Sequence, residues 1–383
     1  MNTDRASVGQ QRPVNVLTGF LGSGKTTLLQ RILRNKSLSN CAVLVNEFGS
    51  VGLDDLFLDA AGQDTIVLPN GCICCAVRDD LGPVLLKLLE RGADGSVPAF
   101  DRVVIETSGV ADPAPIINTV VTNRVLRHHF CIGSTVAVVD GVHGVRHLQE
   151  HEVSRKQVAL ADRIVISKAD IASAHQIQAV YAVLDQLART APVVVSHNDA
   201  DEAVVKLTHD VVQAGEPELS MWFTRTWGDG SPLRAAIHSV RCADDFSRHA
   251  RPDGRSHPAL TLPRPHMDIY DAVALECEAP LNWVAFSLWL SMFVHRYGAQ
   301  LLRIKALLHI EGGETPIALH GVHATIYPPV HMSRLACADH MSRIVLIGYL
   351  PAAGKILESL EAFGASKGRF RIVNARDENA VTR

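Results

Sequence analysis

The first half of the chain alternates short apolar runs with stretches of helical periodicity. The apolar runs are rich in Val and Ile and almost continuous, which is typical of strands buried on both faces of a parallel sheet. The predicted strands are Val14–Thr18, Cys41–Asn46, Thr65–Leu68, Arg102–Glu106, Thr135–Asp140, Arg163–Ser167 and Pro192–Ser196. The predicted helices are Thr27–Arg34, Leu81–Glu90, Ala114–Val121, Glu152–Leu160 and Ala174–Leu187. This alternation predicts an α/β domain with a mostly parallel sheet over residues 1–212.

After residue 212 the alternation of apolar runs with helical stretches ends. Residues 213–265 contain Gly-Asp-Gly, Ser-Pro and a polar stretch at 247–258, which indicates a connector with a flexible loop. Beyond it we expect strands at Met267–Cys277, Leu301–Ile310, Thr315–Leu319, His323–Tyr327 and Arg343–Ile347, with helices at Asn282–Gly298 and Ala353–Phe363. Segregated helices and strands predict a smaller α+β domain over residues 266–383. We expect the tail after Lys367 to be loosely ordered.

Composition narrows the class of protein. The chain has 383 residues, 47% of them apolar, and a formal net charge of −3. Interspersed charges of both signs argue against nucleic acid as a partner. No apolar run approaches the roughly 20 residues of a membrane span, and residues 1–12 lack the apolar region of a signal peptide. We therefore expect a cytoplasmic protein whose 8 cysteines are thiols or metal ligands rather than disulfides.

Residues 19–26 read Gly-Phe-Leu-Gly-Ser-Gly-Lys-Thr, and they match the phosphate-cradling P-loop. A predicted strand precedes the motif and a predicted helix follows it, which is the context that the motif requires. Backbone N–H groups of such a loop, and the helix that it opens, bind phosphate oxygens. We expect Lys25 to act on the β- and γ-phosphates and the Thr26 hydroxyl to ligate Mg²⁺. The predicted phosphate-binding residues are Gly22, Ser23, Gly24, Lys25, Thr26 and Thr27.

A second motif, Ser-Lys-Ala-Asp at residues 167–170, follows the strand that ends at Ser167. It has the form [NTS]-K-x-D. The Asp170 carboxylate can accept hydrogen bonds from N1–H and the exocyclic amine of guanine, a pair of donors that adenine lacks, and the Lys168 stem can lie over the base. The motif therefore favours GTP over ATP, with GDP as the product.

Two acidic residues, Glu47 and Glu106, stand at the ends of predicted strands that we expect to lie near the P-loop. Glu106 is expected as the Walker-B carboxylate, which holds a Mg²⁺ water or orients the attacking water. Gly109 can offer its N–H to the γ-phosphate, which would make residues 108–112 a switch. Glu47 follows the second strand, and it remains open whether it is a Mg²⁺-sphere ligand, a transition-metal ligand or a solvated loop residue.

Residues 71–75 read Gly-Cys-Ile-Cys-Cys after a Pro-Asn-Gly turn. In an extended segment Cys72 and Cys74 project to one side, and Cys75 can join them if the chain bends. Thiolates select Zn²⁺ and softer ions, and Glu47, a histidine or water could complete the site. Buried core cysteines or a redox switch are the alternatives. Because the cluster lies between Glu47 and Glu106, the γ-phosphate could control when it holds an ion.

The combination of motifs resembles the CobW / nitrile-hydratase-activator family of metal-chaperone GTPases. The similar segments are residues 18–29, 45–49, 70–75, 106–109, 111–113, 167–170, 301–305 and 344–348. The resemblance implies slow, metal-regulated GTP hydrolysis that delivers Zn²⁺, or Co²⁺, to a client apo-metalloenzyme recognised by the C-terminal domain. Ser50 stands where many members carry an acidic residue, and the connector has only His249 and His257 with His266 where many members carry a poly-His loop.

Two other functions remain open on the sequence alone. One is a P-loop ATPase or kinase with a structural cysteine site. The other is a redox- or metal-sensing regulator that binds nucleotide without significant turnover. A homodimer is also possible, because a three-cysteine site can be completed across a subunit interface.

Overall fold

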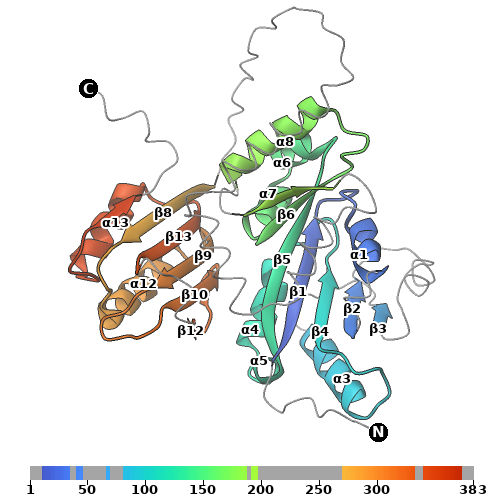
Figure 1. Cartoon of the computed structure of the whole chain (residues 1–383), viewed down its shortest axis with the longest axis horizontal. Helices are drawn as coiled ribbons and strands as arrows, with labels where there is room; N and C mark the ends of the chain where they lie inside the picture. The colour runs from blue at the N-terminus through green and yellow to red at the C-terminus, as the bar shows by residue number, and fades with distance from the viewer. Residues whose placement is uncertain are drawn as a thin grey trace, which may run out of the picture.

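The computed structural model of the chain describes residues 11–34, 40–45, 66–69, 81–187, 191–196, 270–332 and 340–372. These residues form two domains, each built on one sheet (Figure 1). The predicted boundary region at 213–265 lies outside the described residues, so the domain limits stay a prediction.

The N-terminal sheet is parallel throughout, with strand order β3-β2-β4-β1-β5-β6-β7. Its strands are β1 (Arg12–Gly19), β2 (Cys41–Val45), β3 (Ile66–Pro69), β4 (Arg102–Glu106), β5 (Phe130–Asp140), β6 (Arg163–Ser167) and β7 (Val193–Val195). β1 lies between β4 and β5, so the loop after it opens at the middle of the carboxyl edge. This is the P-loop NTPase arrangement that the sequence predicts.

Helices cover both faces of this sheet. They are α1 (Lys25–Arg34), α3 (Leu81–Ala93), α4 (Ala114–Thr122), α5 (Leu126–His129), α6 (Gly144–Glu150), α7 (Glu152–Ala159) and α8 (Ala174–Leu187). Alternate residues of β2 divide between the faces: Val43 is buried with Leu29 of α1, whereas Leu44 is buried with Leu85 of α3 and Ile117 of α4. This is the period of two expected of a strand covered on both sides.

The second sheet has the order β11-β10-β9-β13-β8-β14, with β12 paired to β10, and its pairs are antiparallel. Its strands are β8 (Asp271–Cys277), β9 (Leu301–Leu308), β10 (Ile317–Val322), β11 (Thr325–Ile326), β12 (Val330–His331), β13 (Ser342–Gly348) and β14 (Phe370–Ile372). α12 (Trp283–Tyr297) and α13 (Ala353–Ala362) accompany it. The prediction of a second α+β domain is confirmed.

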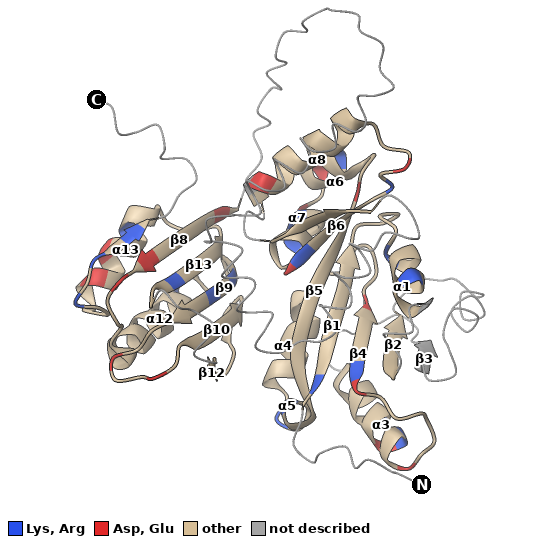
Figure 2. Ribbon diagram, viewed as in Figure 1, with Lys and Arg blue, Asp and Glu red and all other residues tan. Residues whose placement is uncertain are grey.

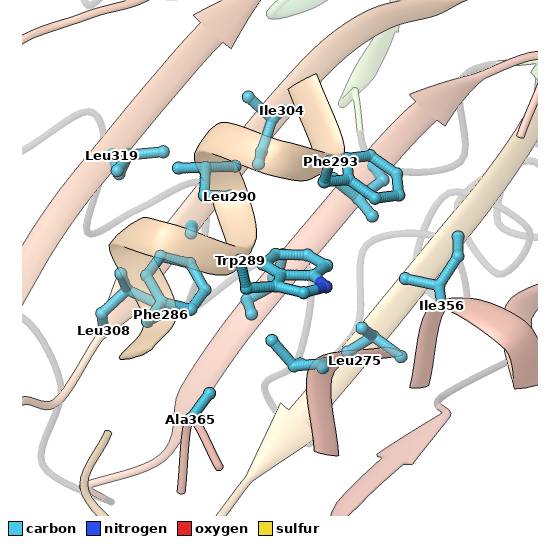
Figure 3. Packing of buried hydrophobic residues seen from close by; sticks show 14 of the residues in the cluster. Leu275, Phe286, Trp289, Leu290, Phe293, Ile304, Leu308, Leu319, Ile356 and Ala365 are labelled. Carbon is cyan, nitrogen blue, oxygen red and sulfur yellow. The ribbon is translucent and has the colours of Figure 1, made fainter. Parts of the chain in front are cut away.

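The core of the C-terminal domain centres on α12 (Figure 3). Trp289 is 1% exposed, stacks near Phe293 at a centroid distance of 5.2 Å, and donates its indole N–H to Ser359 on α13. The helix begins where the Asn282 side chain accepts a hydrogen bond from the N–H of Ala285, which is a favoured N-cap. Burial of these aromatic side chains holds α12 to the sheet.

The two domains share buried structure. One apolar cluster contains Val139 and Ile164 of the N-terminal sheet together with Leu302 and Val345 of the C-terminal sheet. Beside this cluster, the Asp162 carboxylate forms ion pairs of 2.5 Å with Arg303 and with Lys305, both on β9. The domains therefore meet through a continuous core with a charged group at its edge.

Four short elements were not predicted: α5, α6, β12 and β14. β14 contradicts the expectation of a loosely ordered tail, because Phe370 and Ile372 pair with β8. Basic and acidic positions are scattered over both domains rather than gathered in one stripe (Figure 2). In the part of the chain that the structure describes, no helix is both long enough and apolar enough to span a membrane.

Candidate functional site

The loop between β1 and α1 takes a shape that only glycine allows at several points. Gly22 and Gly24 have φ of +69° and +90°, in the left-handed region. At Gly19, φ is +147° and an added Cβ would lie 2.3 Å from the carbonyl oxygen of Val138. An added Cβ at Gly22 would meet nothing within 4 Å. The backbone therefore forms an open cradle at the N-terminus of α1, where an anion is favoured.

The P-loop lysine lies inside this cradle. Lys25 is 7% exposed, and its ammonium group donates to the carbonyl oxygens of Gly19 at 2.9 Å and Phe20 at 3.2 Å. The Ser23 hydroxyl is buried and has no hydrogen-bond partner among the described residues. Thr27, also predicted at the site, is exposed at the start of α1. A buried cation and a buried hydroxyl donor in the loop fit the charge of a polyphosphate.

The two predicted Mg²⁺ ligands lie in contact. The Thr26 hydroxyl donates a hydrogen bond of 2.7 Å to Oε1 of Glu106. Glu106 ends β4, opposite Leu17 of β1 in the strand register, and is fully buried. A hydroxyl and a carboxylate oxygen together are the donor set that Mg²⁺ takes when substrate phosphates supply further ligands. The residues present thus fit the cation that the motif implies.

The segment after Glu106 is held against the P-loop. An added Cβ at Gly109 would lie 2.6 Å from the backbone nitrogen of Leu21, so the two loops touch there. Gln157 of α7, buried at 1% exposure, donates its side-chain N–H to the carbonyl oxygens of Gly109 at 3.2 Å and Ala111 at 3.0 Å. The sequence analysis did not single out Gln157. A polar residue at a helix position expected to be buried is the signal that could have identified it.

The predicted base-reading segment is tied to the phosphate loop. The Ser167 hydroxyl donates to the carbonyl oxygen of Ser23 at 2.6 Å. Lys168 adopts φ of +56° and its ammonium group lies 2.7 Å from Oδ2 of Asp140. Asp170 is exposed beyond it. A serine at the first position of the motif therefore supplies a hydroxyl that connects this segment to the P-loop, and Asp170 faces solvent where a base can approach.

Asp140 is a second residue that sequence reasoning missed. Its side chain is 1% exposed and accepts hydrogen bonds from the backbone N–H groups of Val142 at 2.7 Å and His143 at 2.9 Å. Burial alone would raise the pKa of Asp140, but the hydrogen bonds from Lys168 and from these N–H groups hold its pKa below the ordinary value. The carboxylate thus remains charged and fixes the Lys168 stem.

The predicted transition-metal ligands Glu47, Cys72, Cys74 and Cys75 lie outside the described residues. Within the described ranges, from residue 11 to residue 372 with their gaps, no group of three or more His, Cys, Asp or Glu side chains is placed to hold a metal ion. The described thiols are Cys41, Cys131 and Cys277, and burial raises the pKa of Cys41 to about 12. A thiol so hard to ionise is a core residue rather than a ligand.

Two family models match the chain. Residues 13–195 match the "CobW/HypB/UreG, nucleotide-binding domain" and residues 270–364 match the "Cobalamin synthesis protein cobW C-terminal domain". Both matches fall on the two sheets described above. The first includes the P-loop and the Ser167–Asp170 segment.

Curated relatives and a solved structure agree with these matches. The zinc chaperone YjiA of Escherichia coli (strain K12) is 40% identical over 189 residues, which cover 49% of this chain and 58% of that protein. The zinc chaperone CobW of a Sinorhizobium species is 36% identical over 208 residues, covering 47% and 57%. The chain thus spans little more than half the length of these relatives. The crystal structure of Zn(II)-bound YjiA GTPase from E. coli has a TM-score of 0.62 at 24% identity, covering 92% of this chain and 99% of that one, which supports the fold.

Proposed function

Because the chain belongs to the family that joins a CobW/HypB/UreG nucleotide-binding domain to a cobW C-terminal domain, we propose that it is a GTP-hydrolysing metallochaperone. It binds Zn²⁺, or Co²⁺, through Cys72, Cys74 and Cys75 with Glu47 as a further ligand, and delivers the ion to a client apo-metalloenzyme. The relatives named as zinc chaperones, and a fission yeast relative named as a zinc-regulated GTPase metalloprotein activator, support the metal and the class of client.

The contact between Thr26 and Glu106 carries the hydrolytic half of the proposal. These residues would hold Mg²⁺ beside the phosphates, where the cation supplies neutralisation of the charge that develops on phosphoryl transfer. Lys25 exchanges its two loop carbonyls for phosphate oxygens. Glu106, buried at the end of β4, orients the attacking water, and the Gly109 N–H meets the γ-phosphate. No residue of the site forms a covalent bond to phosphorus in this scheme.

Guanine selection rests on Asp170 and on the support beneath it. Asp170 accepts the two guanine donors, and Lys168, fixed by Asp140, lies along the base. The expected result is that Asp170→Ala lowers GTP affinity by about fivefold or more, because a bidentate base contact contributes roughly 1–3 kcal/mol of discrimination. Unchanged preference for GTP over ATP in that variant would contradict this assignment and favour an ATP-using P-loop protein.

The proposed metal binding is tested by comparing the metal affinity of the protein in two nucleotide states. Zn²⁺ and Co²⁺ affinities are measured on the reduced protein with GDP and with a non-hydrolysable GTP analogue. We expect the metal affinity to differ between the two nucleotide states, and we expect metal binding to be lost in Cys72→Ser and in Cys74→Ser. Linkage then requires that metal changes nucleotide affinity by the same factor. Equal metal affinity in both states would contradict nucleotide-timed delivery, and GTP turnover at background level would favour a sensing module.

The C-terminal domain is the proposed client-recognition element, and homodimer formation stays a prediction. Retention of the client on immobilised protein loaded with the GTP analogue, compared with protein loaded with GDP, tests the first. Sedimentation with and without Zn²⁺ tests the second.

A further inference from the structure

Three histidines form a row beside the P-loop, outside the residues assigned above. His143, His147 and His151 are spaced four residues apart, and backbone hydrogen bonds join His147 to His143 and His151 to His147. The ring centroids are 6.1 Å apart for the first pair and 6.3 Å for the second. His147 lies within α6, and His143 and His151 flank the helix as its N-cap and C-cap residues. Residues four apart in a helical turn lie on one face, so the three imidazoles follow one side of this segment.

The row contacts the phosphate-binding loop through one aromatic ring. Phe20 stacks on His151 at a centroid distance of 4.4 Å and an interplanar angle of 17°, and it meets His147 at 4.8 Å and 48°. The carbonyl oxygen of Phe20 accepts a hydrogen bond from the Lys25 ammonium group. His147 is therefore separated from the P-loop lysine by a single residue in contact with both.

Two of the three rings are open to a ligand. His143 is exposed and His147 is half-buried, whereas the face of His151 is covered by Phe20. Two histidines at i and i+4 on one helical face are a recurrent donor pair for Zn²⁺. Burial, with the neighbouring Arg146, His143 and His151, also holds the pKa of His147 below its usual value despite the opposing Asp140.

We propose that His143 and His147 form an entry site for Zn²⁺ or a similar borderline divalent ion, and that occupancy changes the packing of Phe20 and so the affinity of the P-loop for nucleotide. Since no three ligand side chains among the described residues converge on one point, the ion keeps water in its remaining positions. Such an open site exchanges its ion readily. The inference rests on the proposed function for the ion being cargo.

The test uses the full chain with Cys72→Ser, Cys74→Ser and Cys75→Ser, so that the cysteine site contributes nothing. Zn²⁺ affinity is measured by competition with a chromophoric indicator at saturating Mg²⁺. We expect His143→Gln and His147→Gln each to weaken binding by at least about tenfold, because even residues that only support a ligand contribute 10–100-fold. His175→Gln, an exposed histidine on α8, serves as the matched control and should change nothing. Equal affinity in all four proteins overturns the site.

The coupling between the histidine site and the nucleotide site is tested by a separate measurement. In the same background, with Cys72, Cys74 and Cys75 replaced by Ser, GTP affinity should change on Zn²⁺ addition, and the change should vanish in His147→Gln and in Phe20→Leu. Phe20→Leu should keep its Zn²⁺ affinity, because its side chain is no ligand. A Zn²⁺ effect on GTP that persists in Phe20→Leu overturns the coupling. Equal metal affinity of the protein with intact cysteines in its GDP and GTP-analogue states would instead count against the proposed function.

Discussion

The Ser167 hydroxyl donates a hydrogen bond of 2.6 Å to the carbonyl oxygen of Ser23. This bond joins the segment proposed to read the base to the loop that cradles the phosphates. The same hydroxyl lies 3.3 Å from the carbonyl oxygen of Val139, so it is fixed at the end of the central strands. The Ser167 side chain thus holds the two halves of the nucleotide site in one geometry.

Removing this hydroxyl should weaken nucleotide binding without unfolding the protein. A single neutral hydrogen bond contributes about 0.5–1.5 kcal/mol, so Ser167→Ala should lower GTP affinity by roughly twofold to twelvefold. Fluorescent GTP titration measures the change. Ser167→Thr keeps the hydroxyl and serves as the comparison; equal losses in both variants would show that the hydroxyl is not the cause.

Gln157 should act as a positioning residue for the switch segment. Gln157→Met keeps the size of the side chain but removes the donor to the carbonyl oxygens of Gly109 and Ala111. Each buried acceptor left unsatisfied costs about 1–3 kcal/mol, so the segment should lose its fixed position. We expect kcat for GTP hydrolysis to fall while KM changes little. Steady-state kinetics check this, with exposed Gln149→Met on α6 as control; a change confined to KM would contradict the positioning role.

The Asp140–Lys168 pair predicts a pH dependence of stability. The folded-state pKa of Asp140 is lowered, so its ionisation favours folding at pH above the unfolded pKa of about 3.9, and this contribution is lost as pH falls through the folded-state pKa. The free energy of unfolding of the wild type should therefore exceed that of Asp140→Asn at pH 7 and approach it below pH of about 4. Urea unfolding across this range measures the difference.

An exposed carboxylate provides the comparison for that series. Asp101 is 53% exposed beside Arg102, and a pair of this kind contributes about 1 kcal/mol or less. Asp101→Asn should change the free energy of unfolding by no more than this amount at pH 7. A pH-independent gap between wild type and Asp140→Asn would mean that the effect comes from lost packing rather than from ionisation.

Asp162 should be the most sensitive charged position between the domains. It is 13% exposed and pairs with Arg303 and Lys305, and these cations hold the pKa of Asp162 far below its usual range although burial alone would raise it. Removing one member of a buried charge cluster costs about 3–5 kcal/mol. Asp162→Ala should lower the free energy of unfolding by that amount in denaturant titration.

The control for Asp162 is Glu152, whose carboxylate pairs with Lys156 on the surface of α7 at 3.0 Å. Glu152→Ala should cost less than about 1 kcal/mol. Similar losses for the two variants would indicate that the interdomain cluster contributes no more than a surface pair.

The parallel sheet and the P-loop could be predicted because both leave local signals: apolar runs of strand length, and glycines at fixed spacing before Lys25. α6 could not, because it has only 7 residues, begins at a glycine, Gly144, and is separated from α7 by His151 alone. β14 has three residues and owes its conformation to pairing with β8. Asp140 and Gln157 were missed because their partners, Lys168 and Gly109, are distant in sequence, and only the fold brings them together.

The apolar cluster shared by Val139, Ile164, Leu302 and Val345 limits how the chain can be divided. Chains of separable modules can exchange their parts among relatives, each part keeping its own surface. Here a nucleotide domain expressed alone would present a fresh apolar face to water and invite aggregation. A chimaera that exchanges C-terminal domains, made to test their proposed role in client recognition, would have to carry across the matching side of this cluster.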